Sequence, residues 1–297
     1  MLEAMLFSKP LEAVPDSWAN LGDVGVGRRD HSVTVLGEWL YIFGGILDGS
    51  VKTNDFVRYN LETKVVEQLP VGPSARSASQ MASVNGLIYL YGGAPGTPQR
   101  SQDFWTFDPN ANVWTQLPDG PNVRERGALV EVGGLLYLVG GRSVTEPIAR
   151  PVQCYDPISG TWTTKAEQTQ VRYDPAVVAI GTMIYMHGGF ASADTNMLWV
   201  YDTVNNTWGV LAPNTGTGNS RSEHWAGTAD GKLYTGGGNS QTNNDVYMYD
   251  PESNVWSKRK AHLPRQLQAG FASYRGKIYV HGNSVTPHAA YLWEYTP

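Results

Sequence analysis

The chain of 297 residues carries a formal net charge of −5 and one cysteine, Cys154. The acidic balance excludes a general attraction to nucleic acid or to an anionic membrane surface. A single cysteine excludes an intrachain disulfide framework, and no stretch approaches the roughly 20 apolar residues of a membrane span. Glycine and aromatic residues are abundant, which is typical of short strands and tight turns rather than of helices.

The chain begins with an N-terminal extension, residues 1–16, which is the part least like a strand. The extension lacks the basic start and the long apolar core of a secretory signal, so we expect a cytoplasmic protein. Residues 17–21, Ser-Trp-Ala-Asn-Leu, then match the tryptophan-bearing strands that end the later units. We predict a single domain over residues 17–297.

From residue 28 onward the sequence repeats. Five arginines, called here the register arginines, each stand thirteen residues before a tyrosine that leads into Gly-Gly: Arg28/Tyr41, Arg76/Tyr89, Arg124/Tyr137, Arg172/Tyr185 and Arg221/Tyr234. A sixth copy is one residue out of step, because Arg265 precedes Tyr279 and Gln266 falls in the matching slot. The tyrosines recur every 45 to 49 residues, a period that indicates a propeller or a solenoid.

Each unit contains the same predicted elements in the same order. An alternating first strand, such as residues 31–35, is followed by a turn and a second strand, such as residues 40–43, that ends in Gly-Gly. After a variable loop, a third strand ends in an aromatic residue and Asp, and Trp follows in a fourth strand. Four antiparallel strands form one propeller blade. The predicted blades cover about residues 28–70, 76–118, 124–166, 172–211, 221–260 and 265–297.

These units resemble the Kelch repeat, with its apolar first strand, its Gly-Gly at the end of the second strand and its spaced aromatic residues. The resemblance extends over about residues 17–297 and implies an all-β, six-bladed Kelch β-propeller with four antiparallel strands per blade. The last unit runs out of chain after its third strand. We therefore predict that residues 17–21 supply the missing strand and close the ring by pairing with the C-terminal blade.

The register arginines are expected to share one end of the central channel. Because strand direction alternates within a blade, the loop that enters the first strand and the loop after Gly-Gly lie at the same end. Arginine binds carboxylate or phosphate through two hydrogen bonds, so we expect an anion pocket there. A structural alternative is that each arginine bonds to carbonyls of the next blade. The expected ligand-binding residues are Arg28, Arg76, Arg124, Arg172, Arg221, Arg265, Arg142, Phe190, Trp225, Asn239 and Asn283.

Acids and two histidines follow the register arginines closely. His31 and His224 occupy the same position of their repeats, three residues after the arginine. A His/Glu or Tyr/Asp pair beside arginines can move protons on a bound anion. A plainer alternative is that the acids only neutralise arginine and that the histidines are strand residues. The expected catalytic residues are Asp30, His31, Tyr173, Asp174, Glu223 and His224.

Other chemistry receives little support from the sequence. His187 and His281, just before the second-strand glycines, are expected to pack in the core. No tight His/Cys/Asp cluster or nucleotide-binding motif occurs, so we expect no metal and no cofactor. Cys154 falls in a predicted third strand, which argues against the crosslinked copper site of galactose-oxidase relatives.

Two functions remain open at this stage. The first is a cytoplasmic monomer that binds a small anionic or polyoxygenated metabolite and catalyses a metal-free isomerisation, cyclisation or elimination. A resemblance to stand-alone Kelch propellers such as plant specifier proteins and a sialic-acid mutarotase implies this function. The alternative is an interaction module that binds an acidic peptide at the same face, as Kelch domains of ubiquitin-ligase adaptors do.

Overall fold

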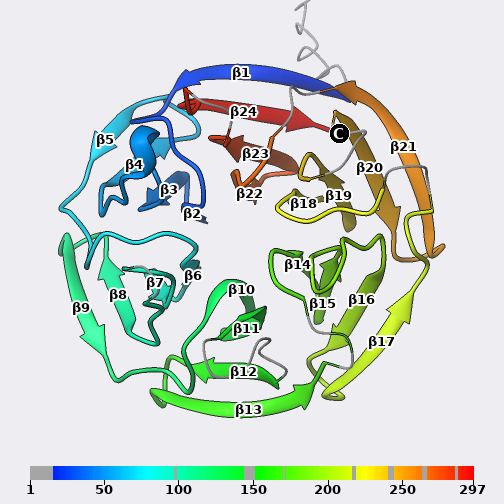
Figure 1. The fold of residues 1–297 in the computed structure, drawn as a ribbon, viewed down its shortest axis with the longest axis horizontal. Helices are drawn as coiled ribbons and strands as arrows, with labels where there is room; N and C mark the ends of the chain where they lie inside the picture. Colours follow the sequence, from blue (N-terminus) through cyan, green and yellow to red (C-terminus); the bar gives the residue numbers. More distant parts are fainter. Residues whose placement is uncertain are drawn as a thin grey trace, which may run out of the picture.

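Six four-stranded antiparallel sheets stand around a central axis in the computed structural model (Figure 1). The structure describes residues 16–96, 99–143, 151–168, 170, 172–215, 219–239, 244–262, 266–284 and 287–297. The predicted extension, except for Asp16, and Arg265 lie outside these residues. Within the described part of the chain, no helix is long and apolar enough to cross a membrane. The six-bladed all-β propeller predicted from the sequence is confirmed.

Each blade runs outward from its first strand, which faces the channel, to its fourth strand at the perimeter. Blade 1 contains β2 (Ser32–Leu36), β3 (Trp39–Phe43), β4 (Phe56–Asn60) and β5 (Val66–Gln68), with a 3-10 turn, η1 (Asp48–Ser50), between β3 and β4. Blade 2 contains β6 (Gln80–Val84), β7 (Leu87–Tyr91), β8 (Phe104–Asp108) and β9 (Val113–Leu117). Blade 3 contains β10 (Glu125–Val132), β11 (Leu135–Arg142), β12 (Pro151–Asp156) and β13 (Thr161–Glu167).

The second half of the ring repeats this order. Blade 4 contains β14 (Ala176–Ile180), β15 (Met183–His187), β16 (Leu198–Asp202) and β17 (Thr207–Leu211). Blade 5 contains β18 (Trp225–Ala229), β19 (Lys232–Gly236), β20 (Asp245–Asp250) and β21 (Val255–His262). Blade 6 contains β22 (Gly270–Tyr274), β23 (Lys277–His281) and β24 (Tyr291–Thr296), and its fourth strand is β1 (Ser17–Asp23).

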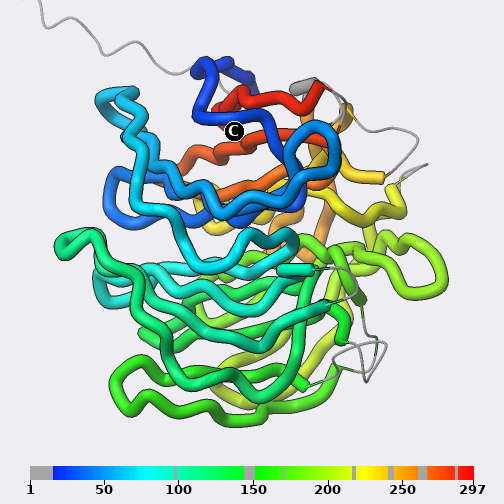
Figure 2. The backbone as a smooth tube through the Cα atoms, turned by 60° about the vertical axis from the view of Figure 1, so that its left-hand side comes forward, coloured from blue at the N-terminus to red at the C-terminus, as the bar shows by residue number. Residues whose placement is uncertain are grey.

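The two ends of the chain close the ring. Strand β1 pairs antiparallel with β24, with Ser17 opposite Thr296 and Trp18 opposite Tyr295. Figure 2 shows this blue N-terminal strand beside the red C-terminal strand. The Trp18 ring contacts Trp225 at 5.5 Å between centroids, so the N-terminal strand packs on blade 5 like the fourth strands of the other blades. The predicted closure is confirmed.

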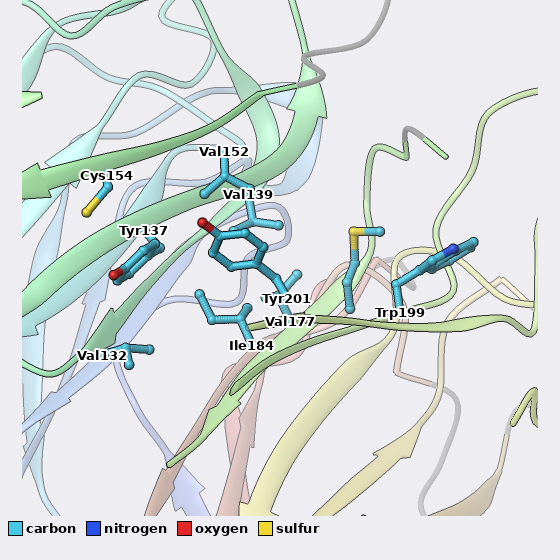
Figure 3. Close-up of a cluster of buried hydrophobic side chains, with 10 residues drawn as sticks. Val132, Tyr137, Val139, Val152, Cys154, Val177, Ile184, Trp199 and Tyr201 are labelled. Atoms are coloured by element: carbon cyan, nitrogen blue, oxygen red, sulfur yellow. The ribbon is translucent and has the colours of Figure 1, made fainter. Parts of the chain in front are cut away.

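The core lies between neighbouring blades rather than inside any one of them. One cluster joins Tyr137 and Val139 of β11 and Cys154 of β12 to Ile184 and Tyr201 of blade 4 (Figure 3). Fourth-strand tryptophans belong to the same contacts between blades. Trp114 of blade 2, for example, lies 5.0 Å from the ring of Phe56 in blade 1. Burial of these aromatic rings is the main force that holds the blades together.

The glycine pairs exist because the next blade passes directly over them. A Cβ atom on Gly44 would lie 2.7 Å from the carbonyl oxygen of Arg76, and Gly44 also has a φ of +67°. The following glycine uses its N–H in the same contact, since Gly45 donates to the Arg76 carbonyl at 2.8 Å. The backbone of each register arginine is therefore part of the contact between consecutive blades.

Blade 6 fits the same contact with different residues. Gln266, not Arg265, occupies the register slot, because Gly238 donates to the Gln266 carbonyl at 2.6 Å. Gln266 is buried like the arginines. Gly282 keeps the first glycine of its pair, where a side chain would collide with the Arg28 carbonyl, while Asn283 takes the second place. The one-residue offset of Arg265 therefore does not shift the strands of blade 6, because Gln266 occupies the register slot.

Candidate functional site

Four register arginines are buried inside the protein and do not line the channel. Arg28, Arg76, Arg124 and Arg221 are at most 1% exposed. Arg76 illustrates their bonding, because its Nη1 donates to the Gly92 carbonyl at 2.9 Å and the guanidinium grips both oxygens of Asp103 at 2.6 and 2.7 Å. This corrects the prediction that these four arginines form an anion pocket at one end of the channel. Each side chain turns back under its own blade, where carbonyls and, in blades 1 and 2, an aspartate satisfy it.

Arg172 and Trp225 also lie away from the channel. Arg172 is half-buried, with its guanidinium 5.7 Å from the ring of Trp199 and its pKa lowered by burial. Trp225 is 2% exposed and belongs to the core between blades 5 and 6, which corrects its assignment to a pocket wall. Arg265 lies outside the described residues.

Two residues beyond each register slot, the six blades join in a closed ring of backbone hydrogen bonds, called here the channel ring. Each of its residues donates its N–H to the carbonyl of the equivalent residue in the preceding blade. The bonds are Asp30 to Gln268 (3.0 Å), Ala78 to Asp30 (2.7 Å), Arg126 to Ala78 (3.1 Å), Asp174 to Arg126 (2.9 Å), Glu223 to Asp174 (3.1 Å) and Gln268 to Glu223 (3.0 Å). All six residues have positive φ angles, between 53° and 58°. Because side chains rarely adopt this conformation, the ring stores backbone strain.

The channel ring gathers three of the predicted catalytic acids around one arginine. Arg126 Nη1 donates to both oxygens of Asp174 at 3.0 Å and reaches Glu223 at 3.4 Å, while Nη2 reaches Asp30 at 3.4 Å. Asp30 and Glu223 belong to blades two places away from Arg126 on either side, so these ion pairs cross the channel. Gln268 adds a bond to Glu223 at 2.8 Å.

The electrostatics of this cluster centre on Asp174. Burial, together with the carboxylates of Asp30 and Glu223, raises the pKa of Asp174 to about 7, although Arg126 opposes the shift. Burial alone would lower the pKa of the Arg126 guanidinium. The three nearby carboxylates have the larger effect, so this pKa is raised. A carboxyl group that titrates near neutral pH can both donate and accept a proton under physiological conditions.

A cavity of about 130 Å³ adjoins the ring residues Asp30, Arg126, Asp174, Glu223 and Gln268. It continues into a larger cavity of about 390 Å³ lined by the first strands of all six blades. The two share several lining residues, which are His31, Ser79, Gly127, Ala128, Ala269 and Phe271. The channel therefore holds a space of ligand size next to a group that titrates near pH 7.

The predicted catalytic histidines form two buried pairs between blades. His31 Nε2 lies 3.0 Å from His281 Nδ1, and His224 Nε2 lies 3.0 Å from His187 Nδ1. Burial, aided by Arg28 and Arg221, lowers the pKa of His281 and His187 to about 3. His31 and His224 are among the residues that line the ring cavity, but each ring also contacts its partner in the neighbouring blade. All four rings are therefore neutral at pH 7.

Comparison with known proteins agrees with the fold. The profile of the KLHDC2/KLHL20/DRC7 Kelch-repeats domain matches residues 16–171 and 128–297. The chain belongs to the Kelch-repeat family. The solved structure of YjhT is similar in fold, with a TM-score of 0.78 and 15% identity over 91% of this chain and 94% of that chain. No curated protein sequence matches the chain.

On the outer side of the channel ring, this Kelch propeller presents the residues that follow the glycine pairs. The backbone pairs Arg29 with Ile46 and Tyr173 with Phe190, which confirms that the two loops share one end. The Tyr173 and Phe190 rings are 5.3 Å apart, and Arg142 lies 5.1 Å from the Tyr173 ring. Asn239 is exposed at the same end, and Asn283 is half-buried after Gly282. These predicted residues surround the ring without entering the cavities described above.

Sequence reasoning missed Arg126, Gln268 and Ala78, although it found Asp30, Asp174 and Glu223. The signal was present in the repeat alignment, because all six stand two residues after the register slot. Arg126 was missed because the arginine that repeats, Arg124, is the more conspicuous of the two. Among the described residues, no group of three His, Cys, Asp or Glu side chains could hold a metal ion.

Proposed function

We propose that this Kelch propeller binds a small polyoxygenated molecule in the channel, against the channel ring, and catalyses a cofactor-independent proton transfer there. An isomerisation, cyclisation or elimination would each need such a transfer. The observation that carries the proposal is Asp174, a carboxyl that is 11% exposed, has a pKa raised to about 7 and borders a cavity beside an arginine. Perturbed acids in cavities are found preferentially at functional sites.

The neighbouring groups have complementary roles in such a reaction. Asp174 would give a proton to one ligand oxygen or remove one from carbon, since both of its forms are populated near pH 7. Arg126 would stabilise negative charge that develops on a ligand oxygen. Its contacts to Asp30 and Glu223, at 3.4 Å, are long enough for a ligand oxygen to replace either of them.

The charge balance of the site favours a neutral ligand over an anionic one. One guanidinium, Arg126, faces the carboxyl groups of Asp30, Asp174 and Glu223, and Arg29 adds a second cation on Asp30 at 2.8 Å. Four of the five register arginines, which were expected to attract an anion, are buried beneath the blades. Hydroxyl groups, which donate and accept hydrogen bonds, suit this mixture of carboxylates, guanidinium and amide.

A ligand screen tests the binding. Thermal shifts would be measured with neutral sugars and polyols and with the matching uronic acids, and we expect the neutral members to stabilise the protein more. Asp174→Asn and Arg126→Met should each weaken the best ligand at least about tenfold, the loss of one charged hydrogen bond. Glu252→Gln, at an exposed acid outside the channel, should bind normally.

A pH profile tests the chemistry. Exchange spectroscopy of the bound ligand reports its interconversion, and the rate should change through a titration near pH 7 that is absent in Asp174→Asn. An Asp174→Asn protein that binds and converts the ligand with an unchanged profile would contradict the proposal.

A second candidate, binding of an acidic peptide, is favoured by one feature outside the channel ring. Arg100 and Arg142 both donate through Nε to a single oxygen of Glu125, at 2.6 and 2.7 Å. Lys52 also lies near Glu125. Burial lowers the pKa of Lys52, and the carboxylate of Glu125 partly opposes this shift. Three cations thus surround one carboxylate. Fluorescence anisotropy with an acidic peptide and its amidated counterpart, on the parent protein and Arg100→Ala, would decide this candidate.

A further inference from the structure

We infer that ligands enter the channel from the end formed by the turns between first and second strands, called here the turn end, and not past the channel ring. The class of ligand rests on the proposed function, but the route itself does not. Three observations lead to this inference: the ring is blocked, the cavity lies on its inner side, and the cavity continues to the turn end.

The channel ring leaves little room for passage. Its six residues are joined backbone to backbone, so adjacent Cα atoms lie about 5–6 Å apart and opposite ones about 11 Å apart before side chains are added. Arg126 then spans the opening, with ion pairs to Asp30 on one side and Glu223 on the other. Entry at this end would require these pairs to break before any contact with the ligand had formed.

The ring cavity opens inward. Its lining residues stand at the ring position or after it in each blade, from Asp30 and His31 in blade 1 to Gln268 and Phe271 in blade 6. The residues that precede the ring, such as Arg29 and Tyr173, belong to the outer face and are not among them. The free space beside Asp174 is therefore reached from inside the channel.

The channel cavity then continues to the turn end. The cavity of about 390 Å³ extends along the first strands as far as Val35 and Glu131, which stand at or near the ends of these strands. It shares Ala179, Thr228 and Ser273 with a third cavity of about 320 Å³. That cavity is lined by the turns at Asp230-Gly231 and Arg275-Gly276, so the space is continuous from the ring to the turn end.

The wall of this route indicates what can travel along it. Among its lining residues, the channel cavity carries one acidic side chain, Glu131, and His31, whose burial lowers its pKa far below neutrality. The rest are small or apolar residues, hydroxyls such as Thr34 and Thr228, and the amide of Gln80. Such a wall suits a neutral hydroxylated molecule. At the turn end, Asp230 and Arg275 of the third cavity carry opposite charges, so Glu131 leaves a net charge of only about −1 along the two cavities. A folded partner is too large for it, so only small molecules would reach Asp174.

Cysteine accessibility tests the route without knowledge of the ligand. The native Cys154 is buried, so the parent protein gives a low background with thiol reagents. Ala128 is half-buried and lines both the ring cavity and the channel cavity. In Ala128→Cys, we would measure the labelling rate with a cationic and an anionic methanethiosulfonate of similar size.

Charge changes at the two ends then report the entrance. Glu131→Lys adds two positive charges at the turn end, and should slow the cationic reagent about fourfold and accelerate the anionic one by as much, for charges about 10 Å from the path. The matched double variant Ile46→Lys/Asn239→Lys adds two positive charges beside the channel ring and should leave both rates unchanged. Melting temperatures would verify that each variant is folded.

Two results would overturn the inference. One is a labelling rate that responds to Ile46→Lys/Asn239→Lys and not to Glu131→Lys. The other is an Ala128→Cys protein that does not react above the parent background, which would mean that the turn end is closed. A failure to find any ligand in the screen would count against the proposed function alone, because the labelling experiment does not involve it.

Discussion

Arg124 and Arg126 stand two residues apart and serve opposite purposes. Arg124 is fully buried, and its guanidinium donates to the carbonyls of Leu138 and Pro151 in its own blade. Arg126 lies in the channel ring and faces carboxylates of three other blades. The first belongs to a position that repeats around the propeller, and the second to a position that varies between blades.

The difference teaches how to separate fold from function in a repeat protein. A position whose surroundings recur from blade to blade tends to keep the same residue, as the register slot does with arginine in five of the six blades. A site that orients one ligand must be asymmetric, so its residues have to differ from blade to blade. The channel ring, with Asp30, Ala78 and Arg126 in successive blades, meets that requirement.

The largest effect expected from this comparison is on stability. Arg76→Met should lower the free energy of unfolding by about 3–5 kcal/mol, because it leaves the carboxylate of Asp103 without its buried partner. Burial disfavours the ionised form of Asp103, and the bonds from Arg76 outweigh this and lower its pKa. Urea unfolding at pH 7 measures the loss.

Arg126→Met is the matched variant for this measurement. It should cost clearly less, because Asp174 can take up a proton when its cation is removed. Equal losses for the two variants would show that Arg126 contributes to stability as much as a register arginine does. That result would contradict the distinction between the two positions.

The histidine pairs should make the protein sensitive to acid. Burial lowers the pKa of His187 and His281 to about 3 from a usual value near 6.5. The unfolded chain therefore binds more protons than the folded one between these values, so stability is complete above pH 6.5 and falls as the pH drops towards 3. We expect a loss on the order of 2 kcal/mol for each of these two histidines at pH 5.

The double variant His187→Gln/His281→Gln isolates this effect. The free energy of unfolding should depend less steeply on pH between pH 7 and pH 4 in the double variant than in the parent. Asp174 contributes in the opposite direction, since its raised pKa makes stability fall as the pH rises towards 7. An unchanged slope in the double variant would mean that the pairs accept protons without strain.

The fold could be predicted from the sequence because its signals repeat. Gly-Gly, the third-strand aspartate and the fourth-strand tryptophan recur in most blades, and each copy supports the others. The closing strand was found for the same reason, since Trp18 matches Trp114 and its equivalents. The direction in which a side chain points cannot be read from the repeat, because it depends on partners that differ between blades. Whether Arg76 points to the channel or under its blade depends on Asp103, 27 residues away.

The candidate site was therefore found in part. Asp30, Asp174 and Glu223 were identified because acids beside arginines suggested chemistry. Arg126 required knowledge that residues two places beyond the slot meet at the axis, which is a property of the closed ring and its positive φ angles. The histidine pairs required knowledge that the end of one blade's second strand faces the start of the next blade.

The smallest expected effect concerns the backbone of the channel ring itself. Ala78 has a φ of +55° but no polar side chain to contribute to the site. Glycine adopts this conformation freely, so Ala78→Gly should stabilise the protein by up to about 1 kcal/mol, despite the greater entropy of the unfolded chain. Ala82→Gly in β6, where the methyl group packs in the core, should destabilise it instead. A loss of stability in Ala78→Gly would mean that the ring is unstrained. A gain would show that a positive φ is unfavourable for the other five residues of the channel ring as well. Non-glycine residues kept at such positions despite this cost are expected to be there for their side chains, which here face the proposed ligand site.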